Sequence, residues 1–136
     1  MKLLREKQVR YLLIGGYAVA YHGYPRATND LDIWIAADTD NAERVVEVIR
    51  NFGFGTPDLS SDLFLKIPNL IRMGVPPIRI EILNEISGVD FEACYSNRVI
   101  DRIGDVEVDI IGATDLKQNK KASGRFKDLD DLQNLP

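Results

Sequence analysis

The sequence predicts a mixed β-sheet flanked by helices, a fold of the α/β or α+β class. Short apolar runs of strand length, such as 11–14 and 78–83, alternate with segments whose apolar residues recur at helical spacing, such as 39–51. No internal repeat, low-complexity tract or linker-like stretch divides the 136 residues, and a chain of this length can bury a core of its own. We therefore expect residues 1–136 to form one domain, with C-terminal helices from about residue 113.

The first third of the chain predicts two strands and three helices. A continuous apolar run, Tyr11–Ile14, ends at Gly15-Gly16, which is typical of a buried strand that enters a tight turn. Aromatic and β-branched residues favour a second strand over 31–36, and Thr39 is the expected N-cap of the helix that follows. The helices are expected over 1–7, 17–22 and 39–51.

The rest of the chain continues this alternation. Gly104-Asp105 lies between two short apolar runs, which is a hairpin signal. Gly124 is expected to end a helix that Thr114 caps. The expected elements are a short helix near Asp62, strands over 70–73, 78–83, 99–103 and 106–111, and helices over 91–95, 114–123 and 127–135.

Composition argues against several classes of function. The formal net charge is −4 and no run of Lys and Arg dominates the chain, whereas a general nucleic-acid binder needs a basic surface to neutralise phosphates. No apolar run approaches the ~18 residues of a membrane span. Cys94 and His22 are the only cysteine and histidine, too few for an internal disulfide or a zinc site. Because the N-terminus lacks a signal-peptide pattern, we expect a cytoplasmic protein.

Two acidic side chains open the second predicted strand. Asp30 and Asp32 are two residues apart, so on a strand they point to the same face, while Leu31 and Ile33 point to the core. Adjacent carboxylates repel one another and are costly to bury without a cation, and their oxygens suit Mg²⁺. The alternative interpretation is a pair of solvated acids at an exposed strand end.

Glu81 is the third candidate carboxylate. It is the one acid in the apolar strand 78–83, and an edge strand with a solvated outer face would explain it equally well. Together with Asp30 and Asp32 on a neighbouring strand, it would complete a cage for two metal ions ~3.5–4 Å apart, the arrangement that serves in-line displacement at phosphorus.

Gly15-Gly16 and the residues before the acid pair are candidates for anion binding. Glycine lets the backbone approach a ligand closely, and the N–H groups of the following helical turn can bind an anion. A plain strand-to-helix turn is the alternative. Arg26 could bind phosphate, and Thr28 could bond a phosphate oxygen or cap the turn, with a structural role equally open for each.

The chain resembles the polymerase β-type nucleotidyltransferase superfamily in the segment LIGGYAVAYHGYPRATNDLDIWI. The superfamily signature is a Gly-Gly or Gly-Ser turn, an acid-x-acid pair on a strand, and a later single acid among apolar residues. These positions are Gly15-Gly16, Asp30 with Asp32, and Glu81, which stands where the superfamily more often has Asp. The likeness is strongest to the small bacterial branch of lincosamide-type antibiotic nucleotidyltransferases and the nucleotidyltransferases of toxin–antitoxin and abortive-infection systems.

The C-terminal segment resembles the closing pattern of the same branch. In that pattern a helix with a basic residue runs through an Ala-Gly-Arg stretch into Lys-Asp-Leu-x-Asp-Leu, and this chain has ATDLKQNKKASGRFKDLDDLQNL. The matching positions are Lys120, Arg125, Lys127, Asp128 and Asp131. Lys121 lies beside Lys120, and the sequence leaves open which of the two lysines points inward.

The resemblance implies a polymerase β-like nucleotidyltransferase fold and a Mg²⁺-dependent enzyme. Asp30, Asp32 and Glu81 would hold two Mg²⁺ ions, and Glu81 would take the proton of an acceptor hydroxyl. ATP or another NTP would donate a nucleoside monophosphate, with release of pyrophosphate. The residues implied in binding its phosphates are Gly15, Gly16, Lys120 and Arg125, with Arg26 and Thr28 as further candidates.

The acceptor stays open at the level of sequence. A small hydroxylated molecule such as an antibiotic is one candidate, and a hydroxyl of a toxin protein, which would make this chain an antitoxin, is another. A catalytically inactive partner-binding module is a third reading, against which the intact acids argue. A homodimer is plausible because so short a chain has little material for an acceptor pocket.

Other chemically suggestive residues are interpreted as structural. Asp105, Glu107 and Asp109 alternate after the hairpin turn, but the apolar residues between them supply the buried face, so we expect all three acids to be solvated. His22 is expected to be non-catalytic, and Trp34 is expected to lie in the core.

Overall fold

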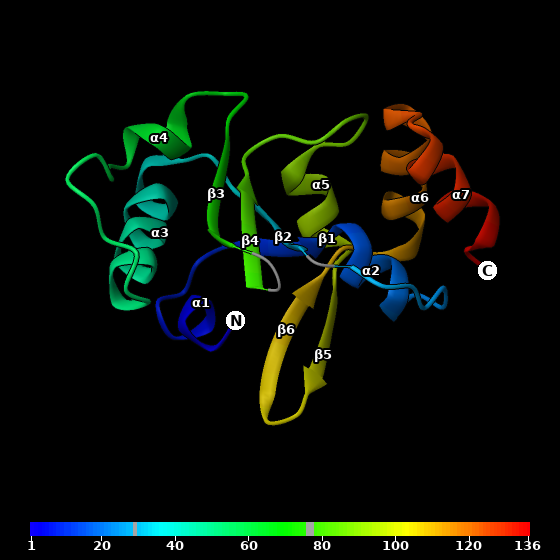
Figure 1. Cartoon of the computed structure of the whole chain (residues 1–136), viewed down its shortest axis with the longest axis horizontal. Helices are drawn as coiled ribbons and strands as arrows, with labels where there is room; N and C mark the ends of the chain where they lie inside the picture. Colours follow the sequence, from blue (N-terminus) through cyan, green and yellow to red (C-terminus); the bar gives the residue numbers. More distant parts are fainter. Residues whose placement is uncertain (29, 76–77) are drawn as a thin grey trace.

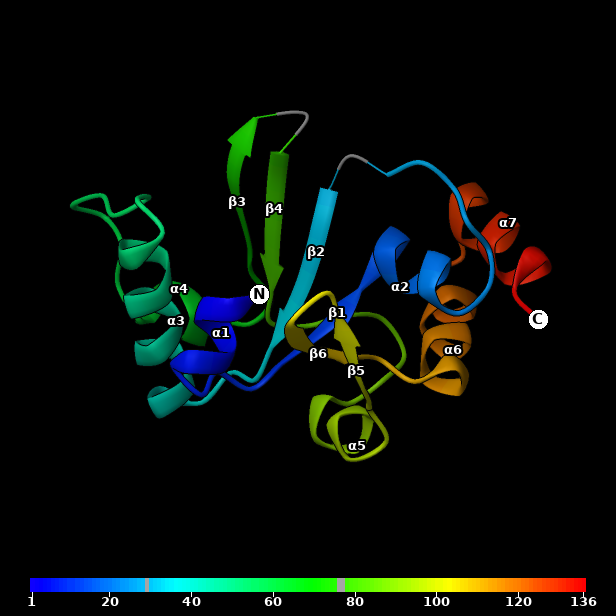
Figure 2. The same cartoon turned by 90° about the horizontal axis from the view of Figure 1, so that it is seen from below.

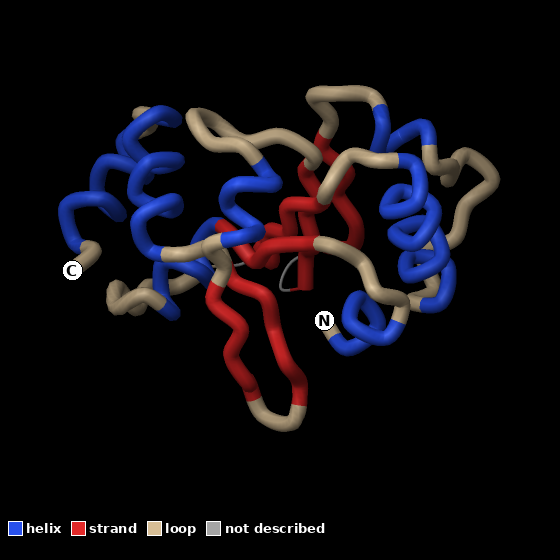
Figure 3. The backbone as a smooth tube through the Cα atoms, turned by 180° about the vertical axis from the view of Figure 1, so that it is seen from behind, coloured by secondary structure: helices blue, strands red, loops and turns tan. Residues whose placement is uncertain are grey.

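A six-stranded mixed sheet forms the centre of the protein, with helices on either side of it (Figures 1 and 3). The structure is a computed structural model that describes residues 1–28, 30–75 and 78–136. The strands are β1 (Tyr11–Ile14), β2 (Asp30–Ile35), β3 (Leu70–Val75), β4 (Ile78–Leu83), β5 (Val99–Ile103) and β6 (Val106–Ile110). The helices are α1 (Lys2–Glu6), α2 (Gly15–Tyr21), α3 (Thr39–Asn51), α4 (Asp62–Leu65), α5 (Phe91–Ser96), α6 (Ala113–Ser123) and α7 (Phe126–Asn134). The predicted fold class is confirmed.

The strand order β3-β4-β2-β1-β6-β5 puts β2 and β1 at the middle of the sheet. β2 pairs antiparallel with β1 and parallel with β4, and β1 pairs parallel with β6. The two outer pairs, β3–β4 and β5–β6, are antiparallel, and the β5–β6 pair projects from the body of the protein (Figure 1). Strands from distant parts of the sequence therefore meet at β2, where the acid pair lies.

The core lies against the sheet and is built by the central strands and α3. All four residues of β1 are buried, as are Ile33, Trp34 and Ile35 of β2, which confirms the expected place of Trp34. In α3 the buried residues recur at helical spacing, so one face of the helix packs on the core. Figure 2 shows α1, α3 and α4 together at one end of the molecule and α6 and α7 at the other.

Three predicted helix starts differ from the structure. The N-cap of α3 is Asp38 rather than Thr39, because the carboxylate of Asp38 accepts the N–H of Asn41 at 2.9 Å. The N-cap of α6 is Gly112 rather than Thr114, because the carbonyl of Gly112 already accepts the first helical bond, from Leu116. The first short helix after β1 begins at Gly15, two residues before the predicted start.

None of the helices in the described part of the chain combines the length and the apolar character that a membrane crossing requires.

Candidate active site

The three predicted carboxylates lie on one face of two neighbouring strands. In the parallel pair β2–β4, Asp32 is directly opposite Glu81 and Asp30 is directly opposite Arg79. Since side chains alternate between the faces of a strand, Asp30, Asp32 and Glu81 share a face. All three line a pocket of about 550 Å³, which Gly15 also lines.

Asp32 is the carboxylate whose charge is least compensated. Its Oδ1 atom is buried and has no hydrogen-bond partner among the described residues. Burial, together with the nearby Glu81 and Asp30 carboxylates, raises the pKa of Asp32 to about 7. Near neutral pH this carboxyl group is therefore poised between its protonated and charged forms, and a nearby cation would stabilise the charged form.

Arginines neutralise the other two carboxylates. Arg79 donates from Nε and Nη2 to the two oxygens of Asp30 at 2.7 and 3.0 Å, and these hydrogen bonds hold the pKa of Asp30 below its usual value. Arg72, on β3, donates from Nε to Glu81 at 2.8 Å. Among the described residues, no three His, Cys, Asp or Glu side chains converge closely enough to form a preformed metal cage.

The donor set nonetheless fits a divalent metal ion. Carboxylate oxygens are the ligands that Mg²⁺ prefers. Asp32 Oδ1 lies beside a second carboxylate and has no partner within the part of the chain that the structure describes. Both oxygens of Asp30 already accept hydrogen bonds from Arg79. A metal ion could therefore bind Asp30 as well only if Arg79 released one of these oxygens or shared it with the ion.

The two glycines after β1 are required by how closely the backbone approaches the site. Gly15 has a positive φ of 67°, and a Cβ added there would lie 2.1 Å from Oδ2 of Asp32. A Cβ added at Gly16 would lie 2.7 Å from Oγ1 of Thr28. Thr28 itself donates to the carbonyl of Asp30 at 3.3 Å. The Gly-Gly turn and Thr28 thus pack directly against the strand end that carries the acid pair.

A buried ionic cluster joins the C-terminal helices to the loop before β2. The ammonium of Lys120 lies 3.0 Å from both Asp128 and Asp131, and Arg26 donates twice to Asp131, at 2.6 and 2.8 Å. Arg125 completes the cluster by donating to Asp128 at 2.7 Å. The structure thereby resolves the choice of lysine, because Lys120 is 3% exposed whereas Lys121 is exposed.

The two carboxylates of this cluster are held in their charged form. Burial alone would raise the pKa of Asp128, but hydrogen bonds from Arg125, Ser123 and Lys120 outweigh it and lower the pKa well below its usual range. The pKa of Asp131 is lowered in the same way, by Arg26 and Lys120. The charge of Lys120 is therefore already offset, although its side chain reaches the edge of the carboxylate pocket.

Three basic residues at the site were not among the sequence-predicted site residues. Arg72, Arg79 and Lys127 all line the carboxylate pocket. Arg79 is two residues before Glu81 on the same strand, so its position on the same face was readable from the sequence. The position of Arg72 could not be read from the sequence, because it depends on the register of β3 against β4.

One expectation about the acids after the hairpin turn is wrong. Asp105 and Glu107 are exposed, but Asp109 is buried and accepts a hydrogen bond from Arg5 at 2.9 Å. The reason is that the two ends of β6 have different surroundings. The strand begins at the tip of the β5–β6 pair, which projects from the body of the protein (Figure 1), whereas α1 supplies Arg5 to Asp109 near its other end.

His22 bonds the carbonyl of Ile111 at 2.7 Å, a contact that ties the end of α2 to the end of β6.

Comparison with known proteins finds this fold in solved structures. No family model matches the sequence, and no curated protein matches it. The chain is similar to a proposed nucleotidyltransferase from Thermotoga maritima, with a TM-score of 0.63, 17% identity, and coverage of 96% of this chain and 84% of that one. It is also similar to the lincosamide antibiotic adenylyltransferase LnuA in its lincomycin-bound form, with a TM-score of 0.56, 15% identity, and coverage of 98% and 89%. At these identities the likeness establishes the nucleotidyltransferase fold alone.

Gly15→Ala is expected to destabilise the protein more than an alanine at an unhindered glycine of the same conformation. A non-glycine residue at positive φ costs of order 1–3 kcal/mol, and at Gly15 the new Cβ would also collide with Asp32. The control is Gly104→Ala, because Gly104 has a φ of 66° and no atom within 4 Å of an added Cβ. Denaturant unfolding measures both, and equal losses would mean that the contact of Gly15 with Asp32 does not exist.

The free energy of unfolding is expected to fall as the pH rises from about 4 to about 7, relative to Asp32→Asn. The folded-state pKa of Asp32 is raised to about 7, so in this window the folded protein retains a proton that the unfolded chain has lost, and each unit of pH favours unfolding. Above about pH 7 the difference in the free energy of unfolding between the unmodified protein and Asp32→Asn should be constant. Denaturant unfolding at pH 5 and pH 8 measures this, and parallel curves for the two proteins would exclude a raised pKa.

Proposed function

We propose that this protein is a metal-dependent nucleotidyltransferase that transfers a nucleoside monophosphate, with ATP as the default donor, to an acceptor hydroxyl group and releases pyrophosphate. The observation that carries this proposal is the pairing of Asp32 with Glu81 on adjacent strands. Asp32 Oδ1 is buried without a hydrogen-bond partner among the described residues, in a pocket that Gly15 and basic side chains also line. The shared fold of two nucleotidyltransferase structures supports it.

Asp30, Asp32 and Glu81 are the residues that would hold Mg²⁺. When bound, Mg²⁺ would stabilise the charge on the phosphate oxygens and lower the pKa of the acceptor hydroxyl. The charges of these residues suit a cation. Burial and then the repulsion from Glu81 and Asp30 raise the pKa of Asp32, and a bound cation would stabilise its charged form. Arg72 and Arg79 stabilise Glu81 and Asp30 before the ion arrives.

The carboxylates also offer a proton acceptor for the reaction. The acceptor oxygen would attack the α-phosphorus, the bond to the pyrophosphate oxygen would break, and the hydroxyl proton would pass to Glu81. Glu81 lies opposite Asp32 at the wall of the pocket, with its side chain 13% exposed. A carboxylate within hydrogen-bond reach of the acceptor hydroxyl can act as a general base.

The opposite wall of the pocket is basic and suits a triphosphate. Arg125 and Lys127 line it together with Lys120. Because Asp128 and Asp131 already offset the charge of Lys120, and Asp128 also pairs with Arg125, the exposed Lys127 would supply most of the attraction. The backbone N–H groups of Gly15 and Gly16 would approach the phosphates. Of the two residues, Gly15 lines the pocket, whereas Gly16 is buried against Thr28.

Arg26 and Thr28 are assigned indirect roles in this proposal. Nε and Nη2 of Arg26 donate to the two carboxylate oxygens of Asp131. Thr28 packs on Gly16 and donates to the carbonyl of Asp30. They would position the loop that delivers the acid pair rather than bind phosphate. The acceptor is proposed to be a small hydroxylated molecule, and the hydroxyl of a partner protein is the alternative that the same assay tests.

Asp32→Ala is expected to abolish nucleotidyl transfer while the protein stays folded. The substitution removes one of the carboxylates that would hold the metal, and losing that stabilisation should slow transfer by roughly a hundredfold or more. Folding should survive because an acid that its neighbours repel contributes little to stability. The measurement is transfer of label from ATP with Mg²⁺ across panels of hydroxylated antibiotics and candidate protein acceptors, with circular dichroism to confirm folding.

The matched control is Glu107→Ala, which removes an exposed acid from the β5–β6 hairpin. Its rate should equal that of the unmodified protein. Equal losses in Asp32→Ala and Glu107→Ala would contradict the assignment of the site. If the unmodified protein binds Mg²⁺ and ATP without transfer to any acceptor, the enzymatic proposal is replaced by a partner-binding function.

A further inference from the structure

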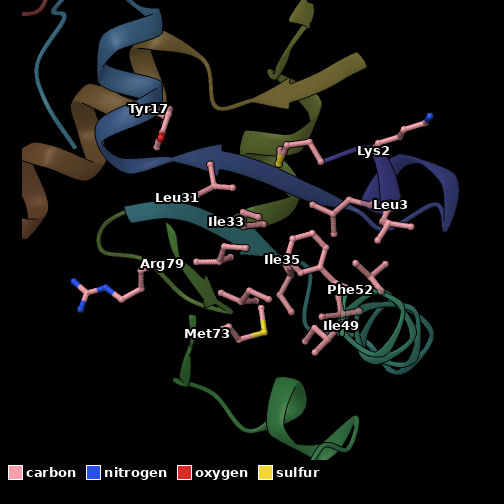
Figure 4. A pocket seen from close by; sticks show the side chains of 16 residues that line it. Lys2, Leu3, Tyr17, Leu31, Ile33, Ile35, Ile49, Phe52, Met73 and Arg79 are labelled. Carbon is pink, nitrogen blue, oxygen red and sulfur yellow. The ribbon is translucent and has the colours of Figure 1, made fainter. Parts of the chain in front are cut away.

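Figure 4 shows a second pocket. It lies on the face of the sheet opposite to the carboxylates, because the strand residues that line it alternate with them. Leu31 and Ile33 of β2 line it together with Ile80 and Ile82 of β4, the residues that alternate with the acids on those strands. Residues of α1 and α3, among them Ile49, form the facing wall. We call this space the apolar pocket. Its volume is about 370 Å³, within the ~300–1,000 Å³ typical of small-molecule sites.

The apolar pocket is open to solvent, and part of its apolar lining is in contact with water. Leu31, Met73 and Ile80 line it and are only partly buried, whereas Ile33, Ile49 and Ile82 are almost fully buried. An apolar group that enters would remove the exposed part of this lining from water, which is favourable by ~25 cal/mol per Å² of apolar surface.

The charges around the apolar pocket are of one sign. Among the described residues that line it, the charged side chains are Lys2 and Arg79, and no acid is present. Figure 4 shows the two at opposite sides of the pocket, with Tyr17 on the side of Arg79. A positive head group would meet no acid among these lining residues. Because Asp30 offsets the charge of Arg79, a negative head group would be favoured by a remaining N–H donor of that arginine rather than by net charge.

Arg79 offers a binding group at the mouth of the apolar pocket. Its aliphatic stem lines the pocket while the guanidinium points away from it (Figure 4). The Nε and Nη2 atoms donate to Asp30, whereas Nη1 makes no hydrogen bond with the described residues. An anionic oxygen can therefore bind Nη1 while Nε and Nη2 keep their contacts with Asp30.

We propose that the apolar pocket binds a small amphipathic carboxylate of the medium-chain fatty-acid type. The hydrocarbon chain lies between the sheet and α3, and the carboxylate accepts hydrogen bonds from Nη1 of Arg79 and from the hydroxyl of Tyr17. Binding at this site does not require that the protein transfers nucleotides. Arg79 lines both this pocket and the carboxylate pocket, so the ligand contacts the residue that neutralises Asp30.

The test is calorimetric titration of the full chain with decanoate below its micelle-forming concentration. Decanol and decyltrimethylammonium serve as probes with the same chain and a neutral or positive head. Decanoate should bind saturably at one site, decanol about tenfold more weakly, and the cation not measurably. Absence of saturable decanoate binding, or equal binding of the cation, would overturn the proposal.

Substitutions locate the ligand within the apolar pocket. Val48→Trp, on α3, fills the space and should abolish binding, and Arg79→Gln should weaken decanoate by about tenfold with no effect on decanol. Lys2→Gln is the control for charge at the other side and should change nothing. A loss in Lys2→Gln but not in Arg79→Gln, or unchanged binding in both Val48→Trp and Arg79→Gln, would refute the assigned site.

A measurement on the unmodified protein covers the case in which Val48→Trp does not fold. Met73 lines the apolar pocket, so its ¹³C-labelled methyl group reports directly on occupancy. Its resonance should shift saturably with decanoate over the same concentrations as the calorimetric signal. An unmoved Met73 resonance during saturable binding would place the ligand elsewhere and contradict the proposal.

Discussion

The parallel pairing of β2 with β4 is the constraint on which the rest of the site depends. Its register sets Asp32 opposite Glu81 and Asp30 opposite Arg79, so two strands that are distant in sequence bring three acids and one arginine to a single face. The same alternation puts Leu31, Ile33, Ile80 and Ile82 on the other face, where they form the core and the apolar pocket. Slipping the register by one residue would exchange the two faces, burying the acids and exposing the isoleucines.

Compensation of charge explains how so many ionisable groups coexist in a small protein. Arg72 and Arg79 stabilise two of the site carboxylates. The third, Asp32, has an oxygen that no other described residue bonds, and its pKa is raised. In the C-terminal ionic cluster the acids stabilise the basic residues instead. The buried carboxylates Asp128 and Asp131 hold Lys120 and Arg26 in place. Removing one partner from that buried cluster would strand a charge in the interior, so the cluster fixes the C-terminal helices against the loop before β2.

The sequence predicted the elements that build the site but only part of its electrostatics. Apolar runs and glycine turns located the six strands, because burial and turn geometry leave local patterns; the spacing of Asp30 and Asp32 likewise indicated a shared face. The partners of Lys120, Arg26 and Arg72 depend on contacts across the fold, which no local pattern records. Asp109 was misassigned for the same reason, since its burial comes from α1 packing over β6. The cap at Asp38 was missed because neighbouring Thr39 is also a good capping residue.

The most direct test of the proposed site is a crystal structure with Mn²⁺ and a non-hydrolysable ATP analogue, in which anomalous scattering locates the metal. Mn²⁺ should lie against the carboxylates of Asp30, Asp32 and Glu81, and the triphosphate should extend from it towards Arg125 and Lys127. In that complex Arg79 should no longer hold both oxygens of Asp30 as it does in the protein alone. Metal bound elsewhere, for example at Asp105 and Glu107, or a triphosphate outside the carboxylate pocket would contradict the account.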